Sequence, residues 1–255
     1  MRLFLKPFAV ALFLFAGIGL ACADTIQLGS FATGAASLGD ANTAMNYAGF
    51  NSSSTTPSIG TATSYTLSPG TPWAPPVANS TWVGYAPNAG PVGTSNPAFG
   101  YYTFTTSFTA LSSSPYSGTL SILADDTAEV LLNGSLLVSF GALGSDVHCS
   151  DNAPTCVTVD AVPLSGLSLL SGVDANTLTF VVRQAGTGPA GGINDPSGVD
   201  FDATLTTVSA VPEPSTLLLL GSALIGFSAI FLRTRGATAM RVLSDRNTVL
   251  DRPNS

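Results

Sequence analysis

The sequence is poor in charged residues, which make up 9% of its 255 positions. An average soluble domain carries about 25%. Basic residues are the scarcest: residues 24–210 contain no lysine and a single arginine, Arg183, against twelve acidic residues, so their formal net charge is −11. A surface of that sign repels phosphate backbones and excludes nucleic acid as a partner. The missing lysine excludes lysine nucleophiles and Schiff-base chemistry from this part of the chain.

Histidine and cysteine are also scarce, and this limits the available chemistry. His148 is the only histidine, and no Gly-x-Ser-x-Gly motif is present, so a serine hydrolase lacks its usual signature. Two cysteines, Cys149 and Cys156, remain once Cys22 leaves with the N-terminal segment described next. In an oxidising compartment this pair predicts a disulfide. The alternative is a metal site formed by the same segment, but the spacing of zinc ligands is missing. Its residues would be Asp146, His148, Cys149, Asp151 and Cys156.

Residues 1–23 are typical of a secretory signal peptide. Two basic residues precede an apolar run, and Ala21-Cys22-Ala23 closes it with small residues at the positions that signal peptidase recognises. We therefore expect signal peptidase to cleave before Asp24 and the exported domain to cover residues 24–210. A lipoprotein signal acylated at Cys22 is the alternative, but Gly19 stands where such signals have leucine.

The C-terminal part predicts a membrane anchor. Residues 215–232 carry no charge, and as a helix at about 1.5 Å per residue they span about 27 Å, close to the thickness of a bilayer core. Arg233 and Arg235 follow at once. This order predicts a cytoplasmic, disordered tail at residues 236–255 and a domain on the outer side.

A recognisable motif stands directly before the anchor. The order Val211-Pro212-Glu213-Pro214, apolar run, arginine pair resembles the PEP-CTERM sorting segment of Gram-negative bacteria, also described as an ice-binding protein C-terminal domain. The resemblance covers residues 211–235. It implies a precursor anchored in the inner membrane, cleavage by an exosortase-type membrane protease, and delivery to the cell surface or to extracellular polysaccharide. The two prolines keep the motif extended, a form that a protease can bind.

The exported residues predict an all-β fold, a jelly roll or β-sandwich. Apolar and polar residues alternate over residues 101–110, 119–123, 177–182 and 201–206. Asn133-Gly134 between two apolar runs is a strong hairpin signal. Residues 51–98 hold eight prolines, which predicts irregular structure packed on the sandwich. Residues 164–170 favour one or two helical turns.

The middle of the chain is similar to the galactose-binding-domain-like jelly roll found in many PEP-CTERM proteins. The resemblance covers residues 80–207, and its most specific part is the Asp125-Asp126 pair followed by the Asn133-Gly134 hairpin. It implies a carbohydrate-binding or structural module that is rarely catalytic by itself. Fold alone does not assign a function.

The acidic residues suggest a calcium site, because Ca²⁺ prefers carboxylate and carbonyl oxygens. The candidate ligands are Asp125, Asp126, Asp195, Asp200 and Asp202. The alternative is that these side chains close turns at the strand ends. A paired-carboxylate glycosidase is disfavoured, since adjacent residues of an extended chain point to opposite faces. We predict no catalytic residue and no cofactor other than calcium.

Aromatic residues suggest a ligand class. Trp73 and Tyr85 are candidates for stacking against a sugar, although aromatic residues equally fill small β cores. We therefore expect a non-catalytic exported surface or matrix protein that binds carbohydrate. A purely structural biofilm component without a ligand is the first alternative, and a secreted hydrolase is the second.

Overall fold

The structure is a computed structural model that describes residues 23–31, 37–143, 149–173, 175–185 and 195–207, with residues 221, 225 and 226. The chain divides into two compact units, one of Cys22–Val208 and one of Met1–Ala21 with Ser209–Ser255. The predicted sorting motif and tail lie outside the described residues, as does the predicted signal peptide apart from Ala23. Of the predicted anchor helix, three helical positions are described. Over the part of the chain that is described, no helix has the length and apolar character needed to cross a membrane.

The Cys22–Val208 unit is formed by β-strands, as the alternating patterns predict, and the all-β fold class is confirmed. Eleven strands occur in the described residues: β1 (Thr25–Gly29), β2 (Ala41–Asn51), β3 (Ala62–Thr66), β4 (Val83–Gly84), β5 (Gly100–Thr109), β6 (Tyr116–Asp125), β7 (Thr127–Leu132), β8 (Ser135–Val138), β9 (Asp160–Leu167), β10 (Ala175–Gln184) and β11 (Gly198–Thr207).

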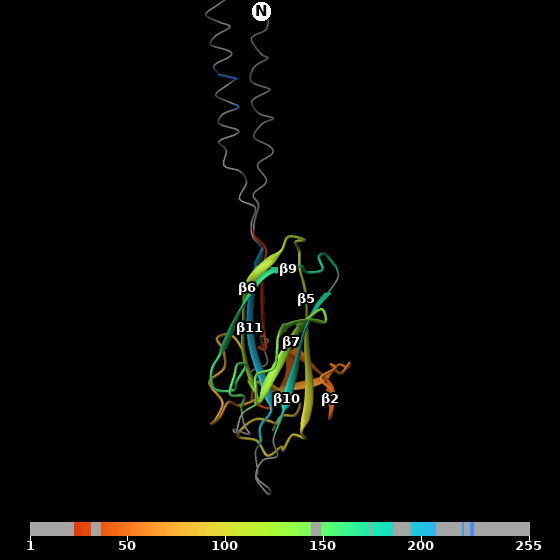
Figure 1. Cartoon of the computed structure of the whole chain (residues 1–255), viewed down its shortest axis with the longest axis vertical. Coiled ribbons are helices and arrows are strands. Elements are labelled where there is room, and N and C mark those ends of the chain that lie inside the picture. The colour runs from red at the N-terminus through yellow and green to blue at the C-terminus, as the bar shows by residue number, and fades with distance from the viewer. Residues whose placement is uncertain are drawn as a thin grey trace, which may run out of the picture. The chain divides into compact units, whose positions relative to one another are not determined.

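The strands form two facing layers, joined through the short strands β3 and β4. Hydrogen bonding follows the order β8-β7-β10-β5-β2-β3-β4-β11-β6-β9, with β1 added to β11. All of these pairs are antiparallel. Figure 1 shows β6, β9 and β11 on one side of the unit and β5, β7 and β10 on the other. The result is a sandwich whose strand sequence nearly closes into a barrel.

The core between the layers comes from the apolar half of each alternating pattern. Phe104 of β5, Phe180 of β10 and Phe201 of β11 are buried there. The rings of Phe180 and Phe201 lie 4.4 Å apart between centroids and join the two layers. Asn133 and Gly134 both have positive φ, 50° and 82°, which matches the tight hairpin predicted between β7 and β8.

One sequence-based expectation about local structure is wrong. Residues 164–170 were expected to form a helical turn, whereas Leu164 and Leu167 belong to β9 and pair with β6. Both leucines pack against the core. Sheet pairing therefore decides the conformation of a segment whose short apolar run fits either structure.

A second, smaller core lies on the outer side of the β6–β11 layer. Leu123 of β6 is buried there under Trp73 and Trp82, together with Leu67, Ala89 and both cysteines. The proline-rich residues 51–98 supply most of this cover and also contribute β3 and β4. This layer encloses the end of β6, where the acidic residues lie.

Candidate functional site

Three carboxylates gather at one end of the sandwich. Asp125 is the last residue of β6, Asp126 lies in the turn to β7, and Asp195 lies three residues before β11. All three side chains are fully buried. Asp125 pairs across the sheet with Gly198, and its charge is coupled to both Asp126 and Asp195. We call this end of the sandwich the acidic pole.

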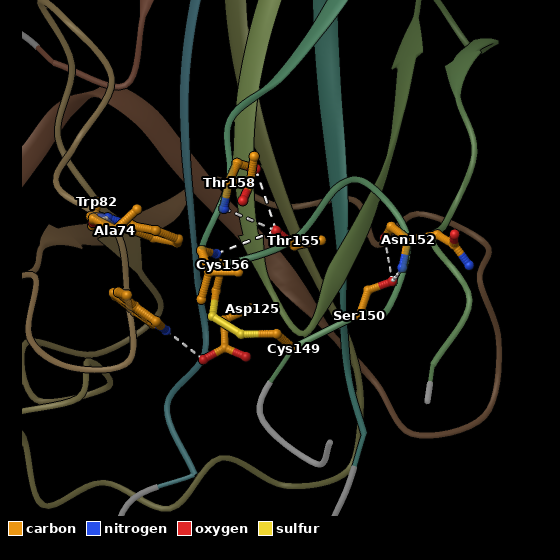
Figure 2. Close-up of a disulfide and its surroundings, with 11 residues drawn as sticks. Ala74, Trp82, Asp125, Cys149, Ser150, Asn152, Thr155, Cys156 and Thr158 are labelled. Carbon is orange, nitrogen blue, oxygen red and sulfur yellow. Dashed lines mark hydrogen bonds between the residues drawn. A yellow bond between two sulfur atoms is a disulfide. The ribbon is translucent and has the colours of Figure 1, made fainter. Parts of the chain in front are cut away.

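Asp125 is held between an indole and a disulfide. The Trp73 indole Nε1 donates a hydrogen bond of 2.5 Å to Asp125 Oδ2. The carboxylate lies beside the Cys149–Cys156 disulfide (Figure 2), and its oxygen and the two sulfur atoms fall within 4.8 Å of one another. Its second oxygen, Oδ1, is buried and accepts no hydrogen bond. This is an acceptor that a bound cation would satisfy.

Asp126 is fixed by the neighbouring backbone. Its Oδ2 accepts a hydrogen bond of 2.5 Å from the Ala185 amide. Its own amide donates to the Arg183 carbonyl at 3.1 Å, and its carbonyl accepts from the Ser150 amide at 2.9 Å. Asp126 therefore ties β10 and the disulfide loop to the β6–β7 corner.

The expectation that Asp125 and Asp126 point apart is wrong. The charge of Asp126 acts on Asp125 and raises the pKa of its carboxyl group. The alternation rule holds within a strand, but Asp126 lies in the turn after β6, where the chain is no longer regularly extended. The two carboxyl groups consequently act as one cluster.

Burial governs the acid–base behaviour of this cluster. Desolvation raises the pKa of Asp125 well above its usual value, the charge of Asp126 raises it further, and that of Asp195 adds to the effect. Only the Trp73 hydrogen bond acts in the opposite direction among the main influences. Without a cation, Asp125 therefore holds a proton at a pH where an exposed aspartate is ionised.

The chemistry of the cluster fits calcium better than a transition metal. Calcium takes carboxylate and carbonyl oxygens, and its two charges would relieve the repulsion among buried acids. The cysteines offer no thiolate, because the structure joins them in a disulfide with Cα atoms 5.6 Å apart. This supports the predicted disulfide and removes the sulfur-based alternative. His148 and Asp146 lie outside the described residues.

Two of the candidate calcium ligands lie elsewhere. The Asp200 carboxylate accepts hydrogen bonds of 2.7 Å from Ser30 Oγ and 2.7 Å from the Val77 amide, which ties it to the covering loops. Asp202 pairs with Ser121, four positions along the strand from the Asp125 pair, or about 13 Å at the rise of a strand. The charges of Asp126 and Asp195 thus act on Asp125, whereas Asp200 and Asp202 lie further along β11. Among the described residues, the set of potential metal-ligand atoms within 4.8 Å of one another consists of an Asp125 oxygen and the two disulfide sulfur atoms.

The two aromatic candidates differ in position. Trp73 is only 5% exposed and stacks on Trp82 with ring centroids 4.0 Å apart. Its ring is therefore not available to an external sugar, and its role in the structure is to bind Asp125. Tyr85 is half-buried and stacks on Tyr102 at 4.7 Å.

Tyr85 belongs to a group of aromatic side chains, of which the sequence analysis did not consider Tyr47 and Phe50. Tyr47, Tyr85 and Phe50 surround Tyr102, and Phe50 lies 4.8 Å from it and is 39% exposed. We call these four residues the aromatic cluster. Phe50 pairs with Tyr102 near the start of β5, and β5 begins opposite the end of β10, at the acidic pole. The sequence pattern that would place Tyr47 and Phe50 in this cluster is weak, because a bulge near Gly49 interrupts the alternation of apolar and polar residues along β2.

The chain enters and leaves the sandwich at the opposite end. Asp24 and Thr207 form two hydrogen bonds there: the Thr207 amide donates to the Asp24 carbonyl, and the Asp24 amide donates to the side-chain Oγ1 of Thr207, both at 2.9 Å. The Asp24 carboxylate binds the Tyr116 hydroxyl at the start of β6. β6 then runs nine residue steps from Tyr116 to Asp125, about 30 Å at the rise of a strand. We call this end the terminal pole.

Comparison with known proteins identifies the C-terminal motif. A profile of the PEP-CTERM protein-sorting motif matches residues 210–235. The motif marks an exported protein of Gram-negative bacteria whose membrane-anchored precursor is sorted by an exosortase. A search of curated proteins finds no match to the chain.

Two solved structures show limited similarity. A GH26-CBM35 β-(1,4)-mannanase of Podospora anserina aligns with a TM-score of 0.34 and 13% identity over 74% of this chain and 29% of that one. A β-glucosidase from Kluyveromyces marxianus, in complex with glucose, aligns with a TM-score of 0.27 and 11% identity over 64% of this chain and 15% of that one. This chain thus spans less than a third of either protein. At such TM-scores the similarity carries no functional argument.

Proposed function

We propose that this exported protein is a non-catalytic surface or matrix component whose acidic pole binds carbohydrate, with calcium bound by Asp125, Asp126 and Asp195. The observation that carries the proposal is the polarity of the sandwich. Asp24 and Thr207 place both ends of the domain at the terminal pole, while Asp125 at the end of β6 lies about 30 Å away. Phe50 and Tyr102 of the aromatic cluster pair near the start of β5, toward the acidic pole. In a protein sorted through its C-terminus, the acidic pole is the end free to meet extracellular polymer.

Each part of the pole has a separate task. The aromatic cluster offers Phe50 and Tyr85 as surfaces on which a sugar ring stacks. The three acids are fully buried, so a calcium ion there stabilises the corner between β6 and β7 rather than meeting solvent. By stabilising this corner, calcium also stabilises the neighbouring strands that carry the aromatic cluster.

The enclosure of the acidic side chains supports a binding role over a hydrolase. The coupled acids are enclosed, whereas a glycosidase needs two carboxyl groups that flank an accessible bond. Asp200 is engaged by Ser30 and Val77.

A glycan array tests the proposal with the oxidised domain 24–210, in calcium and in chelator. We expect binding to be stronger in calcium, and Tyr85→Ala to weaken it by up to about tenfold, the value of one aromatic contact. Leu136→Ala is the matched control. Leu136 is an exposed apolar residue of β8, next to the Asn133-Gly134 turn at the end of β7 that lies away from the acidic pole. A folded domain that binds no glycan in either condition would instead favour the structural alternative.

The sorting step has its own test in the native bacterium. Replacing both Pro212 and Glu213 by alanine removes the group that an exosortase recognises, so the precursor should accumulate at its full size in the membrane. Replacing Arg246 and Arg252 in the tail is the matched control. Unchanged size and location of the Pro212→Ala, Glu213→Ala protein would sink the proposed processing.

A further inference from the structure

The terminal pole carries several exposed apolar side chains. Leu111, in the loop between β5 and β6, is 81% exposed. Leu170 and Val173, in the loop between β9 and β10, are 48% and 98% exposed. Isolated exposed apolar residues are common on protein surfaces, but these three belong to two loops that are joined by a hydrogen bond.

Hydrogen bonds place both loops beside the ends of the domain. The Leu111 amide donates to the Asp24 carboxylate at 3.1 Å, and Asp24 in turn pairs with Thr207. The Gly172 amide donates to the Ala110 carbonyl at 2.9 Å. The apolar side chains therefore surround the position at which the chain leaves β11 toward the sorting motif.

The charge of this pole differs from that of the whole domain. Residues 110–115 and 168–173 contain no ionisable side chain, although residues 24–210 carry a net charge of −11. Asp24 is the acid that the described structure places here, and the Tyr116 hydroxyl and the Leu111 amide both bind its carboxylate. Asp174, the next acid along the chain, lies outside the described residues. The two loops themselves are thus uncharged, and the Asp24 carboxylate lies beside them.

The connection to the anchor is short. Seven residues, 208–214, separate Thr207 from the apolar run that begins at Ser215. Fully extended, they span at most about 27 Å, and the head-group layer takes up roughly 6 Å of that length. The terminal pole consequently remains within about 20 Å of the lipid surface, at a high effective concentration relative to it.

We propose that the terminal pole rests on the membrane in the anchored precursor, with Leu111, Leu170 and Val173 inserted among the lipid head groups. This inference rests on the anchor helix at 215–232. The occupant is a lipid surface because the tether holds the pole beside one, and because uncharged apolar loops avoid the repulsion that an acidic surface meets at anionic lipid. The contact points the acidic pole away from the membrane until the exosortase removes the anchor.

Fluorescence quenching in proteoliposomes tests this contact. The chain 24–255 is reconstituted in vesicles of phosphatidylethanolamine and phosphatidylglycerol that contain a head-group quencher. An environment-sensitive probe is attached at Ser113→Cys, in the terminal pole, or at Ser52→Cys, beyond the end of β2 near the acidic pole. Both serines are exposed, and the native cysteines are buried in their disulfide.

We expect strong quenching at position 113 and none at position 52. The variant Leu111→Ser with Val173→Ser should lower the quenching at position 113 at least threefold while the protein still floats with the vesicles. Equal quenching at the two positions, or quenching at 113 that the double variant leaves unchanged, overturns the proposal. A chain that does not float with the vesicles overturns the anchor helix as well, and this outcome separates the two failures.

Discussion

The buried carboxyl of Asp125 makes an unusual stability prediction: Asp125→Asn should stabilise the calcium-free domain at neutral pH. Asparagine has the size of aspartate and still offers an oxygen to the Trp73 indole, which donates the 2.5 Å hydrogen bond. It carries no charge to be desolvated. It also removes the repulsion from Asp126 and Asp195, the charges that raise the pKa of Asp125 further.

The size of the effect follows from proton linkage. Because burial raises the pKa of Asp125 in the folded state, the folded domain keeps a proton that the unfolded chain releases. Below the unfolded value of about 3.9 both states are protonated and stability is unaffected. Above it the free energy of unfolding of the parent falls as pH rises, by about 1.4 kcal/mol per pH unit, until the raised pKa is passed. Asp125→Asn does not lose stability in this way. Its free energy of unfolding relative to the parent therefore increases with pH by the same amount per pH unit.

Urea unfolding in chelator measures this advantage across several pH values. Emission from Trp73 and Trp82 monitors the transition, since both indoles are buried in the folded domain. Asp40→Asn is the matched control, because Asp40 is exposed. If the difference between Asp125→Asn and the parent stays constant with pH, or if the variant is less stable throughout, our assignment of a buried protonated acid is refuted.

Calcium should make the parent protein more stable than Asp125→Asn, the reverse of the order expected in chelator. An ion bound only to the folded state stabilises the parent by about 2.7 kcal/mol at a concentration one hundred times its Kd. Asp125→Asn removes a ligand charge and should gain much less. Equal stabilisation of the two proteins by calcium would show that the ion binds away from Asp125.

Three further predictions concern other parts of the domain. Replacing Cys149 and Cys156 by alanine should lower the free energy of unfolding by about 2.4 kcal/mol in the chain-entropy model, as measured by urea titration, and an unchanged midpoint would contradict it. Gly118→Ala places a Cβ 1.8 Å from a carbonyl oxygen of β11, so we expect a loss of at least about 3 kcal/mol, visible as a drop in Tm. The hydrogen bond from the Tyr116 hydroxyl is the main cause of the lowered pKa of Asp24, so Tyr116→Phe should destabilise the domain at neutral pH. Thermal melts should show the difference in stability between variant and parent shrinking as the pH falls through the lowered pKa of Asp24.

The sequence by itself determined the sorting motif and the class of fold. Both depend on local order along the chain. The motif is a run of adjacent residues from Val211 to Arg235. A strand is recognised by the alternation of apolar and polar residues, and Phe180 of β10 and Phe201 of β11 are apolar residues of such patterns that lie in the core. The Asn133-Gly134 turn is equally local, because its two positive φ angles require those residue types.

The candidate site was only partly predictable. Acidic residues at 125, 126 and 195 were visible as candidates, but pattern alone could not separate them from Asp200 and Asp202. The register of β11 against β6 makes that separation, since it sets Gly198 opposite Asp125 and Asp202 opposite Ser121. Register is a long-range property, fixed by which side chains fill the core.

Tertiary structure alone decided the environment of each group. Trp73 was a candidate for an exposed sugar platform, and the packing of residues 51–98 on β6 instead buries it against Trp82 and Asp125. The polarity of the domain likewise arises from antiparallel pairing, which returns β11 to Asp24 and leaves the acids at the far end. A sequence lists which residues are present, but burial, charge coupling and the distance between two ends depend on contacts between segments far apart in the chain.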